Sequence, residues 1–338
     1  MSFDTPVLLL AWRRPHTTQQ VINAIRAVKP TRMFVACDGP NPKRPGEAAK
    51  VMATREEIER EIDWPCTLER RYSEVNQGCR VGVSNAITWF FDQVDEGIIL
   101  EDDCIPHLDF FKYCSDLLEH YRNDTRVFSI CGSNFQQGHV RGDASYYFSI
   151  HSDSWGWATW RRAWQFYAEA QESWIAFRDS SAISDVFLIS AEKEYWINIL
   201  NKLFVQRNSD SWAYQWLLAC WMNNALSIWP NTNLVTNVGF QMVDATHTQG
   251  ESKFAELSTS SLGLISHPRF VIANREADAY AFYQRRLGRI FILRNKLGIF
   301  YNIFRFFDIF FTDGPRKAFL KVREGSLTIL SKWDSEKQ

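Results

Sequence analysis

Three acidic residues in a row, Glu101, Asp102 and Asp103, directly follow the apolar stretch Gly97–Leu100. A buried strand would therefore deliver three carboxylates to its carboxyl end. So much negative charge in one place is unfavourable without a counter-cation, and carboxylate oxygens are ligands that Mg²⁺ and Mn²⁺ prefer. Such ions commonly keep water and bridge to the phosphates of a substrate. The motif predicts a divalent-cation site, and a solvated acidic turn is the alternative.

Two other groups of polar residues also follow apolar runs directly. Arg13 and Arg14 come after the first run, and Asp38 comes after the second. A planar guanidinium pairs with phosphate or stacks on a base, and a carboxylate accepts hydrogen bonds from hydroxyl groups. Solvated surface arginines, and a turn that Asp38 forms with Gly39, are the structural alternatives.

These residues are positioned by short apolar runs that alternate with helical patterns. The predicted strands are Val7–Leu10, Met33–Cys37, Leu68–Tyr72 and Gly97–Leu100, and the predicted helices are Thr17–Val28, Glu47–Ile62 and Val81–Phe91. This alternation indicates right-handed crossovers and a mainly parallel sheet. Ligands bind beyond the carboxyl ends of the strands in such sheets, so we expect the three polar groups to meet in one crevice. After residue 131 the pattern loosens into loops and aromatic-rich helices at Trp155–Phe166 and Trp212–Asn223.

Composition excludes several classes of protein. The 338 residues are 46% hydrophobic, which is too much for a disordered chain, and the net charge of −1 gives no field that would attract nucleic acid. Seven Cys occur without any CxxC spacing, which argues against a disulfide framework or a structural zinc site. The apolar run at Val7–Trp12 is too short for a signal peptide or a membrane span. We therefore expect a cytoplasmic protein.

The wider sequence resembles the GT-A type nucleotide-sugar glycosyltransferases, whose acidic DxD element follows a strand and holds a divalent ion against the donor diphosphate. The acidic triplet followed by Pro106 and Asp109–Phe111 is similar to the same stretch of the N-acetylglucosaminyltransferase I family, and still more to a group of bacterial hemolytic-protein-like glycosyltransferases. The segments that carry the resemblance are Asn76–Arg80, Val83–Ile87, Gly97–Pro106 and Asp109–Phe111, and it covers most of residues 5–250.

The resemblance implies an α/β protein with a Rossmann-like, mainly parallel sheet flanked by helices at residues 1–255, and a helical C-terminal extension at residues 256–338. It implies a metal-dependent, inverting enzyme that moves a sugar from a nucleotide-sugar donor, with UDP and UDP-N-acetylglucosamine favoured, to a glycan or lipid-linked acceptor in bacterial surface polysaccharide synthesis. A non-catalytic carbohydrate- or nucleotide-binding module is the main alternative. A sugar nucleotidyltransferase is the third, without a Gly-rich Lys/Arg signature near the N-terminus to support it.

The resemblance also assigns roles to individual residues. Asp103 is the expected ligand of Mn²⁺ or Mg²⁺, with Asp102 and Glu101 contacting the ribose, the donor sugar or metal-bound water. His247, in the sequence Asp-Ala-Thr-His-Thr, is a further metal ligand or diphosphate contact, or else a structural histidine.

Donor-binding roles fall on residues at the strand ends and near one helix start. Asp38 is expected to contact the uracil or ribose edge, and Arg13 and Arg14 lie near the nucleotide. Arg80 follows Gly78 near a predicted helix start and is a diphosphate candidate.

A glycine-and-tryptophan loop, Trp155–Arg162, matches the loop that flanks the donor sugar in the family. Glycine would let the backbone approach a ligand, and tryptophan offers a face to a pyranose. We expect Gly156 and Trp157 to serve the donor site, and Trp160 and Trp164 to pack in the core.

The position of the catalytic base is unusual. The family reads Trp-Asp-Tyr-Gln-Trp where this chain reads Trp-Ala-Tyr-Gln-Trp, so Ala213 stands where an acidic residue is expected. An inverting transferase needs a base for the acceptor hydroxyl, and alanine cannot act as one. Either the base has been replaced at Ala213, which we prefer, or Asp210 in the preceding loop takes its role.

The C-terminal part has a different character. From Arg285 to Arg323 there are ten Lys and Arg against two Asp, and basic and aromatic residues interleave at helical spacing between Tyr283 and Phe311. Such a segment is typical of helices that lie on an anionic membrane surface, and a core helix is the alternative. Residues 283–323 therefore predict a peripheral association with the inner leaflet.

Overall fold

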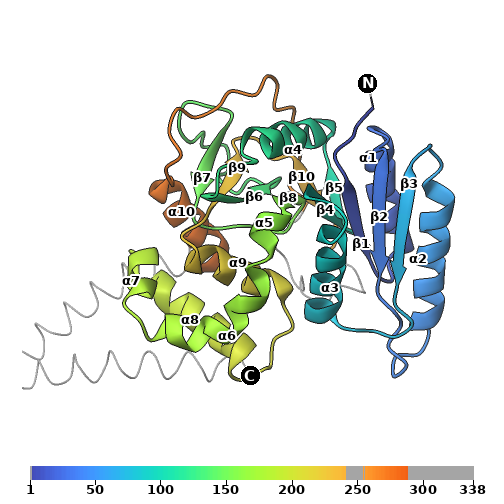
Figure 1. Cartoon of the computed structure of the whole chain (residues 1–338), viewed down its shortest axis with the longest axis horizontal. Coiled ribbons are helices and arrows are strands. Elements are labelled where there is room, and N and C mark those ends of the chain that lie inside the picture. Colours follow the sequence, from blue (N-terminus) through green and yellow to red (C-terminus); the bar gives the residue numbers. More distant parts are fainter. Residues whose placement is uncertain (1, 241–253, 255, 288–338) are drawn as a thin grey trace, which may run out of the picture. The chain divides into compact units, whose positions relative to one another are not determined.

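The computed structural model describes residues 2–240, 254 and 256–287 (Figure 1). A central sheet has the order β3-β2-β1-β4-β8-β6-β9-β7, and a second sheet pairs β10 with β5. The strands are β1 (Val7–Ala11), β2 (Arg32–Cys37), β3 (Thr67–Tyr72), β4 (Glu96–Glu101), β5 (Cys104–Pro106), β6 (Val127–Cys131), β7 (Tyr146–Ser149), β8 (Trp157–Trp160), β9 (Leu226–Pro230) and β10 (Val235–Asn237). The helices are α1 (Pro15–Arg26), α2 (Glu47–Glu61), α3 (Cys79–Phe91), α4 (Leu108–His120), α5 (Arg161–Trp164), α6 (Tyr167–Arg178), α7 (Ala182–Val186), α8 (Ser190–Phe204), α9 (Trp212–Met222) and α10 (Arg275–Phe282), followed by a π-helical turn at Tyr283–Leu287.

The first four strands of the sheet are parallel, which confirms the predicted fold class, an α/β protein with a mainly parallel sheet flanked by helices. β1 lies between β2 and β4, and Leu10 is in register with Ala36 on one side and Glu101 on the other. The chain therefore leaves β1 toward β2 and β3, and later returns to the opposite side of β1 as β4. This reversal is the topological switch point at which open α/β sheets form their ligand crevice.

The second half of the sheet was only partly predicted. β8 runs antiparallel between β4 and β6, β9 is parallel to β6, and β7 is antiparallel to β9. The helix expected at Trp155–Phe166 is wrong over its first part, because Trp157–Trp160 is β8 and the α5 helix is only four residues long. All four residues of β8 are buried, so this strand shows no alternation between polar and apolar residues that would have revealed it.

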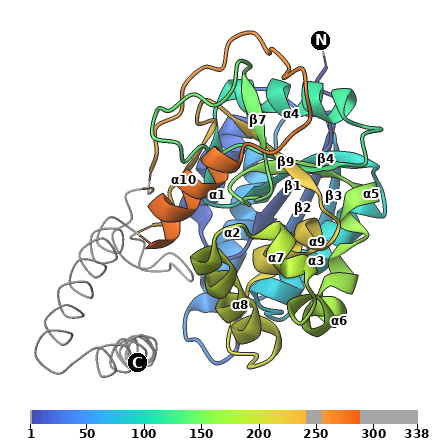
Figure 2. The same cartoon turned by 90° about the vertical axis from the view of Figure 1, so that its left-hand side faces the viewer.

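The central strands are covered on both faces. Alternate residues of β1 enter two cores: Leu8 and Leu10 pack with residues of α3, α6, α8 and α9, whereas Val7, Leu9 and Ala11 pack with residues of α1, α2 and α4. Burial on both sides explains why the parallel strands read as continuous apolar runs. Helices α6, α7, α8 and α9 gather into one group in both views of the molecule (Figures 1 and 2).

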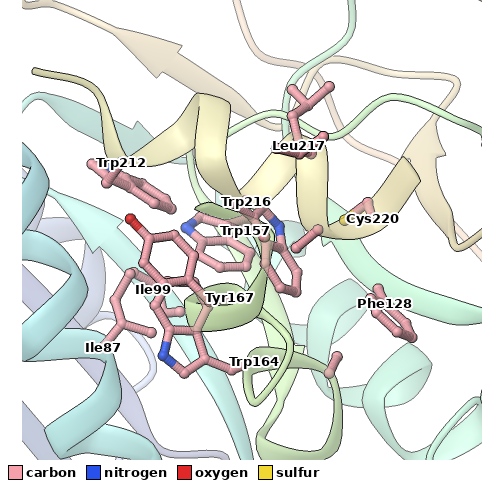
Figure 3. Packing of buried hydrophobic residues seen from close by; sticks show 14 of the residues in the cluster. Ile87, Ile99, Phe128, Trp157, Trp164, Tyr167, Trp212, Trp216, Leu217 and Cys220 are labelled. Atoms are coloured by element: carbon pink, nitrogen blue, oxygen red, sulfur yellow. The ribbon is translucent and has the colours of Figure 1, made fainter. Parts of the chain in front are cut away.

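An aromatic cluster joins that helical group to the sheet (Figure 3). The ring of Trp157 on β8 lies 5.6 Å from the rings of both Trp212 and Trp216 on α9, and Trp164 stacks on Tyr167 at 4.3 Å. Large aromatic rings bury more apolar area than other side chains, so this cluster fixes α9 firmly against β8. The first turn of α9 is thereby held next to the carboxyl end of β4.

Two glycines let the two sheets approach each other. The amide of Gly132 donates to the carbonyl of Gly156 at 2.8 Å, and Gly156 has a left-handed φ of +64°. A Cβ atom at Gly156 would lie 2.7 Å from Cγ2 of Val235 on β10, and one at Gly132 would lie 2.5 Å from the same atom. Neither position has room for a side chain.

The first compact unit of the chain ends at Ala279, later than the expected boundary at residue 255. Asp109 accepts hydrogen bonds from Ser261 and Leu262, and Ser145 accepts one from the amide of Ser266. These contacts attach residues of the expected extension to the α/β unit. Most of the basic, aromatic segment at residues 283–323 lies outside the described residues. Among the described residues, no helix combines the length and the apolarity that crossing a membrane requires.

Replacing Gly156 by alanine should lower the free energy of unfolding by about 2–4 kcal/mol, because the left-handed backbone and the overlap with Val235 both add to the cost. Gly138→Ala is the matched control: its φ is +88°, but nothing lies within 4 Å of its added Cβ. The control should lose only about 1 kcal/mol. Urea denaturation of the two variants measures the difference, and equal losses would contradict the packing role of Gly156.

Candidate active site

A cavity of about 390 Å³ opens at the carboxyl ends of β1, β2 and β4 and reaches the first turns of α3 and α9. It lies at the topological switch point, where the fold was expected to form its crevice. Seven of the sequence-predicted site residues line it: Arg14, Asp38, Glu101, Asp102, Asp103, Asp210 and Ala213. The structure thus brings together residues that lie up to 199 positions apart in the sequence.

An ion-pair cluster forms the floor of the cavity. One Nη atom of Arg14 lies 2.5 Å from Oδ2 of Asp103 and 3.2 Å from Oδ1 of Asp102. All three side chains are at most 14% exposed. Arg14 is the residue before helix α1, and its carbonyl accepts a hydrogen bond from the hydroxyl of Thr18 at 2.7 Å. Pro15 at the first helical position fixes the backbone direction, so the Arg14 side chain starts from a well-defined point.

The other oxygens of these two carboxylates are also engaged. Oδ2 of Asp102 accepts the amide hydrogen of Trp12 at 3.1 Å, and Oδ1 of Asp103 accepts from the side-chain amide of Asn237 at 3.4 Å. Asn237 is the last residue of β10. The backbone amide of the next residue, Val238, donates to the carbonyl of Asp103 at 2.9 Å. The segment that contains β10 and Arg14 therefore both fix the position of Asp103.

Burial and mutual repulsion shift the pKa values of this cluster. Burial, with the negative charges of Asp103 and Asp102, raises the pKa of Glu101 from its ordinary 4.5 to about 8. Burial also raises the pKa of Asp102, and the positive charge of Arg14 opposes that rise. Burial lowers the pKa of Arg14, but the charges of Asp102 and Asp103 outweigh it, so the net shift is upward and Arg14 stays charged. The cavity therefore favours additional positive charge.

Without divalent ions, the protein should lose stability as pH rises between about 4.5 and 8, because the folded state keeps a proton on Glu101 that the unfolded chain releases. The slope contributed by one such group is at most about 1.4 kcal/mol per pH unit. Glu101→Gln removes the ionisation, so this variant should be more stable than the unmodified protein at pH 8. Thermal unfolding from pH 4.5 to 8.5 measures this, with the exposed Glu194→Gln as control. A Glu101→Gln curve parallel to that of the unmodified protein would contradict the assignment.

Asp38 organises the loop that follows β3. Its carboxylate accepts hydrogen bonds from the amides of Gly39 and Gln77 at 2.8 and 3.0 Å, and from the side chain of Asn76 at 2.9 Å. Burial raises its pKa, although hydrogen bonds from backbone amides partly offset the rise. The turn with Gly39 is thus present, and Asp38 also lines the cavity. The expected turn is therefore present, and the expected contact with a nucleotide stays a prediction.

Two of the predicted donor-binding arginines have other partners. Arg13 pairs with Glu47 at 2.5 Å and lies over the ring of Trp12, with 4.1 Å between its guanidinium carbon and the ring centroid. Arg80 donates to the side chain of Gln171 at 2.9 Å. Neither side chain is among those that line the cavity. Arg14 is thus the one of the three predicted arginines whose side chain lines the cavity.

The expected roles of Gly156 and Trp157 require correction. Trp157 is completely buried among the rings of Trp164, Trp212 and Trp216, so it offers no face to a sugar. The space over Gly156 is filled by Val235, so its missing side chain serves packing rather than ligand approach. Trp160 and Trp164 are core residues, as expected.

Trp155, two residues earlier in the same loop, does line the cavity. Gly156, with its left-handed backbone, lies between the two tryptophans, so their side chains enter different surroundings. The lining also includes residues that the sequence analysis did not single out for this site, among them Trp12, Arg44, Arg71 and Ser211. Arg71 lies on β3 opposite Ala36 of β2, and nothing in its local sequence marked it.

Asp210 is held by the amino end of helix α3. Its two carboxylate oxygens accept the amide hydrogens of Cys79 and Arg80 at 2.9 and 3.0 Å. These amides have no partner within the helix, so Asp210 acts as its cap from 131 positions away. Ala213, on the first turn of α9, lines the same cavity. A carboxylate at position 213 would therefore share the space that Asp210 borders.

The described residues fit a divalent ion in their chemistry, since buried carboxylate oxygens crowd at one strand end. Among the described residues, however, no three His, Cys, Asp or Glu side chains are arranged as a ready metal site. Oδ2 of Asp103, the expected ligand, is paired with Arg14. His247, the other expected ligand, lies outside the described residues.

Comparison with known proteins gives no family. No family model matches the sequence, and no curated protein matches it. Solved structures match parts of the chain at low similarity. Staphylococcus aureus TarS, residues 1–349, has 9% identity and a TM-score of 0.33, with 48% of each chain covered. HddC from Yersinia pseudotuberculosis has 10% identity and a TM-score of 0.30, covering 47% of this chain and 78% of HddC.

A UDP-glucose pyrophosphorylase complexed with UDP-glucose has 9% identity and a TM-score of 0.29, covering 49% of this chain and 80% of its own. This chain thus spans about half the length of the TarS chain. Likeness at this level assigns neither a family nor a function.

Proposed function

We propose that the protein is a glycosyltransferase that moves a sugar from a nucleoside diphosphate donor, a UDP-sugar, to a hydroxyl group of an acceptor with inversion at the anomeric carbon. The observation that carries this proposal is the cavity at the switch point, where Arg14 and three carboxylates at the end of β4 face Asp38 and the first turns of α3 and α9. Such an arrangement offers a cation for phosphate and carboxylates for a divalent ion and for sugar hydroxyls.

The donor would lie across the carboxyl ends of β1, β2 and β4. Asp38 and Trp12 border the part of the cavity next to β2, which would take the nucleoside, and Arg14 would pair with the diphosphate. Asp103, with His247 as a further ligand, would hold Mn²⁺ or Mg²⁺, which neutralises the leaving diphosphate when bound. Glu101 and Asp102 would accept hydrogen bonds from donor hydroxyls. Trp155 takes over the sugar-facing role first expected of Trp157.

Inversion requires a base on the acceptor side of the anomeric carbon, because the hydroxyl attacks from the face opposite the leaving group. Positions 210 and 213 border the cavity together, on the side of α9. Only one protein carboxylate is needed for such transfer, in contrast with the paired carboxylates of glycoside hydrolysis. Asp210 already caps α3 with both oxygens, so its use as a base would weaken that cap.

The acceptor that we propose is a glycan or lipid-linked glycan of the bacterial surface, reached from the cytoplasmic face of the membrane. This part rests on the sequence of residues 283–323, whose basic and aromatic residues suit an anionic lipid surface.

Binding of the donor is tested by thermal shift, because a ligand that binds only the folded state raises its apparent stability. We expect one UDP-sugar to raise the melting temperature in the presence of Mn²⁺, and EDTA or Asp103→Ala to abolish the effect. Asp116→Asn, a change at a surface ion pair with Lys112, is the control and should leave the shift intact. No response to any nucleotide would contradict the proposal. Binding without donor hydrolysis or transfer would favour the non-catalytic module.

The two hypotheses for the catalytic base predict different effects of mutation on the turnover number. If position 213 has lost its base, Ala213→Asp should raise turnover by about 10²–10⁴, the usual contribution of a general base. If Asp210 is the base, Asp210→Asn should lower turnover by the same factor while Ala213→Asp has no effect. Initial rates of UDP release at saturating donor measure both, with Ser211→Ala as a control at the adjacent lining residue. A product that retains the anomeric configuration would contradict both assignments.

A further inference from the structure

Arg14 occupies one carboxylate oxygen of Asp103, for which a divalent ion would compete. One Nη atom serves both carboxylates, at 2.5 Å from Asp103 and 3.2 Å from Asp102. The other oxygen of Asp103 accepts from Asn237 of β10 and from the thiol of Cys104. Arg14, which follows β1, therefore engages the oxygen of Asp103 that those two side chains do not contact.

A guanidinium and a divalent ion would compete for that oxygen. Divalent ions sit about 2.0–2.6 Å from carboxylate oxygens, so the ion would lie within about 5 Å of the Arg14 nitrogen. The Arg14 side chain is only 14% exposed, so water screens it weakly and two cations this close repel each other strongly. Binding of the ion at Asp103 therefore favours departure of the Arg14 side chain.

Arg14 has a short path to a new partner. It lies at the amino end of α1, and the backbone around it is fixed by Pro15 and by the hydroxyl of Thr18, so only its side chain needs to move. It borders the same cavity as Asp38 and Asp210, so a diphosphate bound there would lie within its reach. Guanidinium groups pair with phosphate in two-pronged geometry as readily as with carboxylate.

We propose that Arg14 is an exchangeable internal counter-cation: it neutralises Asp102 and Asp103 while the cavity is empty, and it transfers to the donor phosphates when a divalent ion takes its place on Asp103. This inference rests on the proposed function, because it requires a diphosphate in the cavity. Binding of the ion and binding of the nucleotide then favour each other. The ion frees Arg14 for the phosphates, and the phosphates draw Arg14 away from the carboxylate that the ion needs. Neither the ion nor the nucleotide alone gains the full interaction.

The test measures Mn²⁺ binding to the full chain without nucleotide, by electron paramagnetic resonance of the free ion. Arg14→Met should bind Mn²⁺ about 10 to 100 times more tightly than the unmodified protein, since a neighbouring cation changes the proton affinity of a carboxylate by a comparable factor. Arg14→Lys keeps the charge but cannot form a fork, so its affinity should fall between the two. Arg13→Met is the matched control, because Arg13 pairs with Glu47, and it should leave Mn²⁺ affinity unchanged.

Unchanged or weaker Mn²⁺ binding by Arg14→Met, checked to be folded by circular dichroism, would overturn the proposal. If Arg14→Met does not fold, Arg14→Lys decides: tighter Mn²⁺ binding supports the exchange, and equal or weaker binding overturns it. A second titration with UDP separates this inference from the proposed function. If Arg14→Met loses UDP affinity but does not gain Mn²⁺ affinity, the proposed donor site is supported and the proposed exchange of Arg14 is overturned. Absence of UDP binding by the unmodified protein, with or without Mn²⁺, removes the proposed function and the transfer to phosphate with it.

Discussion

The concentration of carboxylates at the end of β4 is the constraint on which the rest of the site depends. Glu101, Asp102 and Asp103 line one cavity, where burial and the neighbouring carboxylates raise the pKa of Glu101 and burial and Asp103 raise that of Asp102. Removing charges from water costs several kcal/mol per ion unless ion pairs and hydrogen bonds compensate for the lost hydration. Three groups supply these interactions: Arg14 just before α1, the amide of Trp12 just after β1, and Asn237 on β10. The parallel pairing of β1 with β4 brings the first two partners to the carboxylates.

The surrounding architecture serves to hold this cluster in place. The aromatic cluster fixes α9 on β8, and β8 is the strand next to β4, so the loop at Asp210 and Ala213 is placed with the same firmness as the sheet. Gly132 and Gly156 allow β10 to approach, which brings Asn237 within reach of Asp103. A site on rigid elements suits chemistry that depends on position, because small displacements of the reacting groups cost large factors in rate.

The local sequence was enough to predict the first half of the fold and the polar residues at the strand ends, for a physical reason. Parallel strands buried on both faces read as apolar runs, and the polar residue after each run marks its carboxyl end; Arg14, Asp38 and Asp103 were found in this way. Other features depend on contacts between distant segments, which local patterns do not record. Asp210 caps a helix that begins 131 positions earlier, and Arg71 enters the cavity through strand pairing alone. Trp155 and Trp157 are only two residues apart, yet one lines the cavity and the other is buried, with the left-handed backbone of Gly156 between them. The four residues of β8 are all buried and show no alternating pattern that would have revealed this difference.

We propose that one cavity binds a nucleoside diphosphate through Arg14 and a divalent ion through Asp103. A crystal structure of the full chain with UDP and Mn²⁺ is the decisive test. We expect Mn²⁺ on Asp103, the diphosphate in the cavity between β1 and β4, and Arg14 turned from the carboxylates to a phosphate oxygen. UDP bound elsewhere, or Arg14 still bridging Asp102 and Asp103 beside a bound diphosphate, would contradict it.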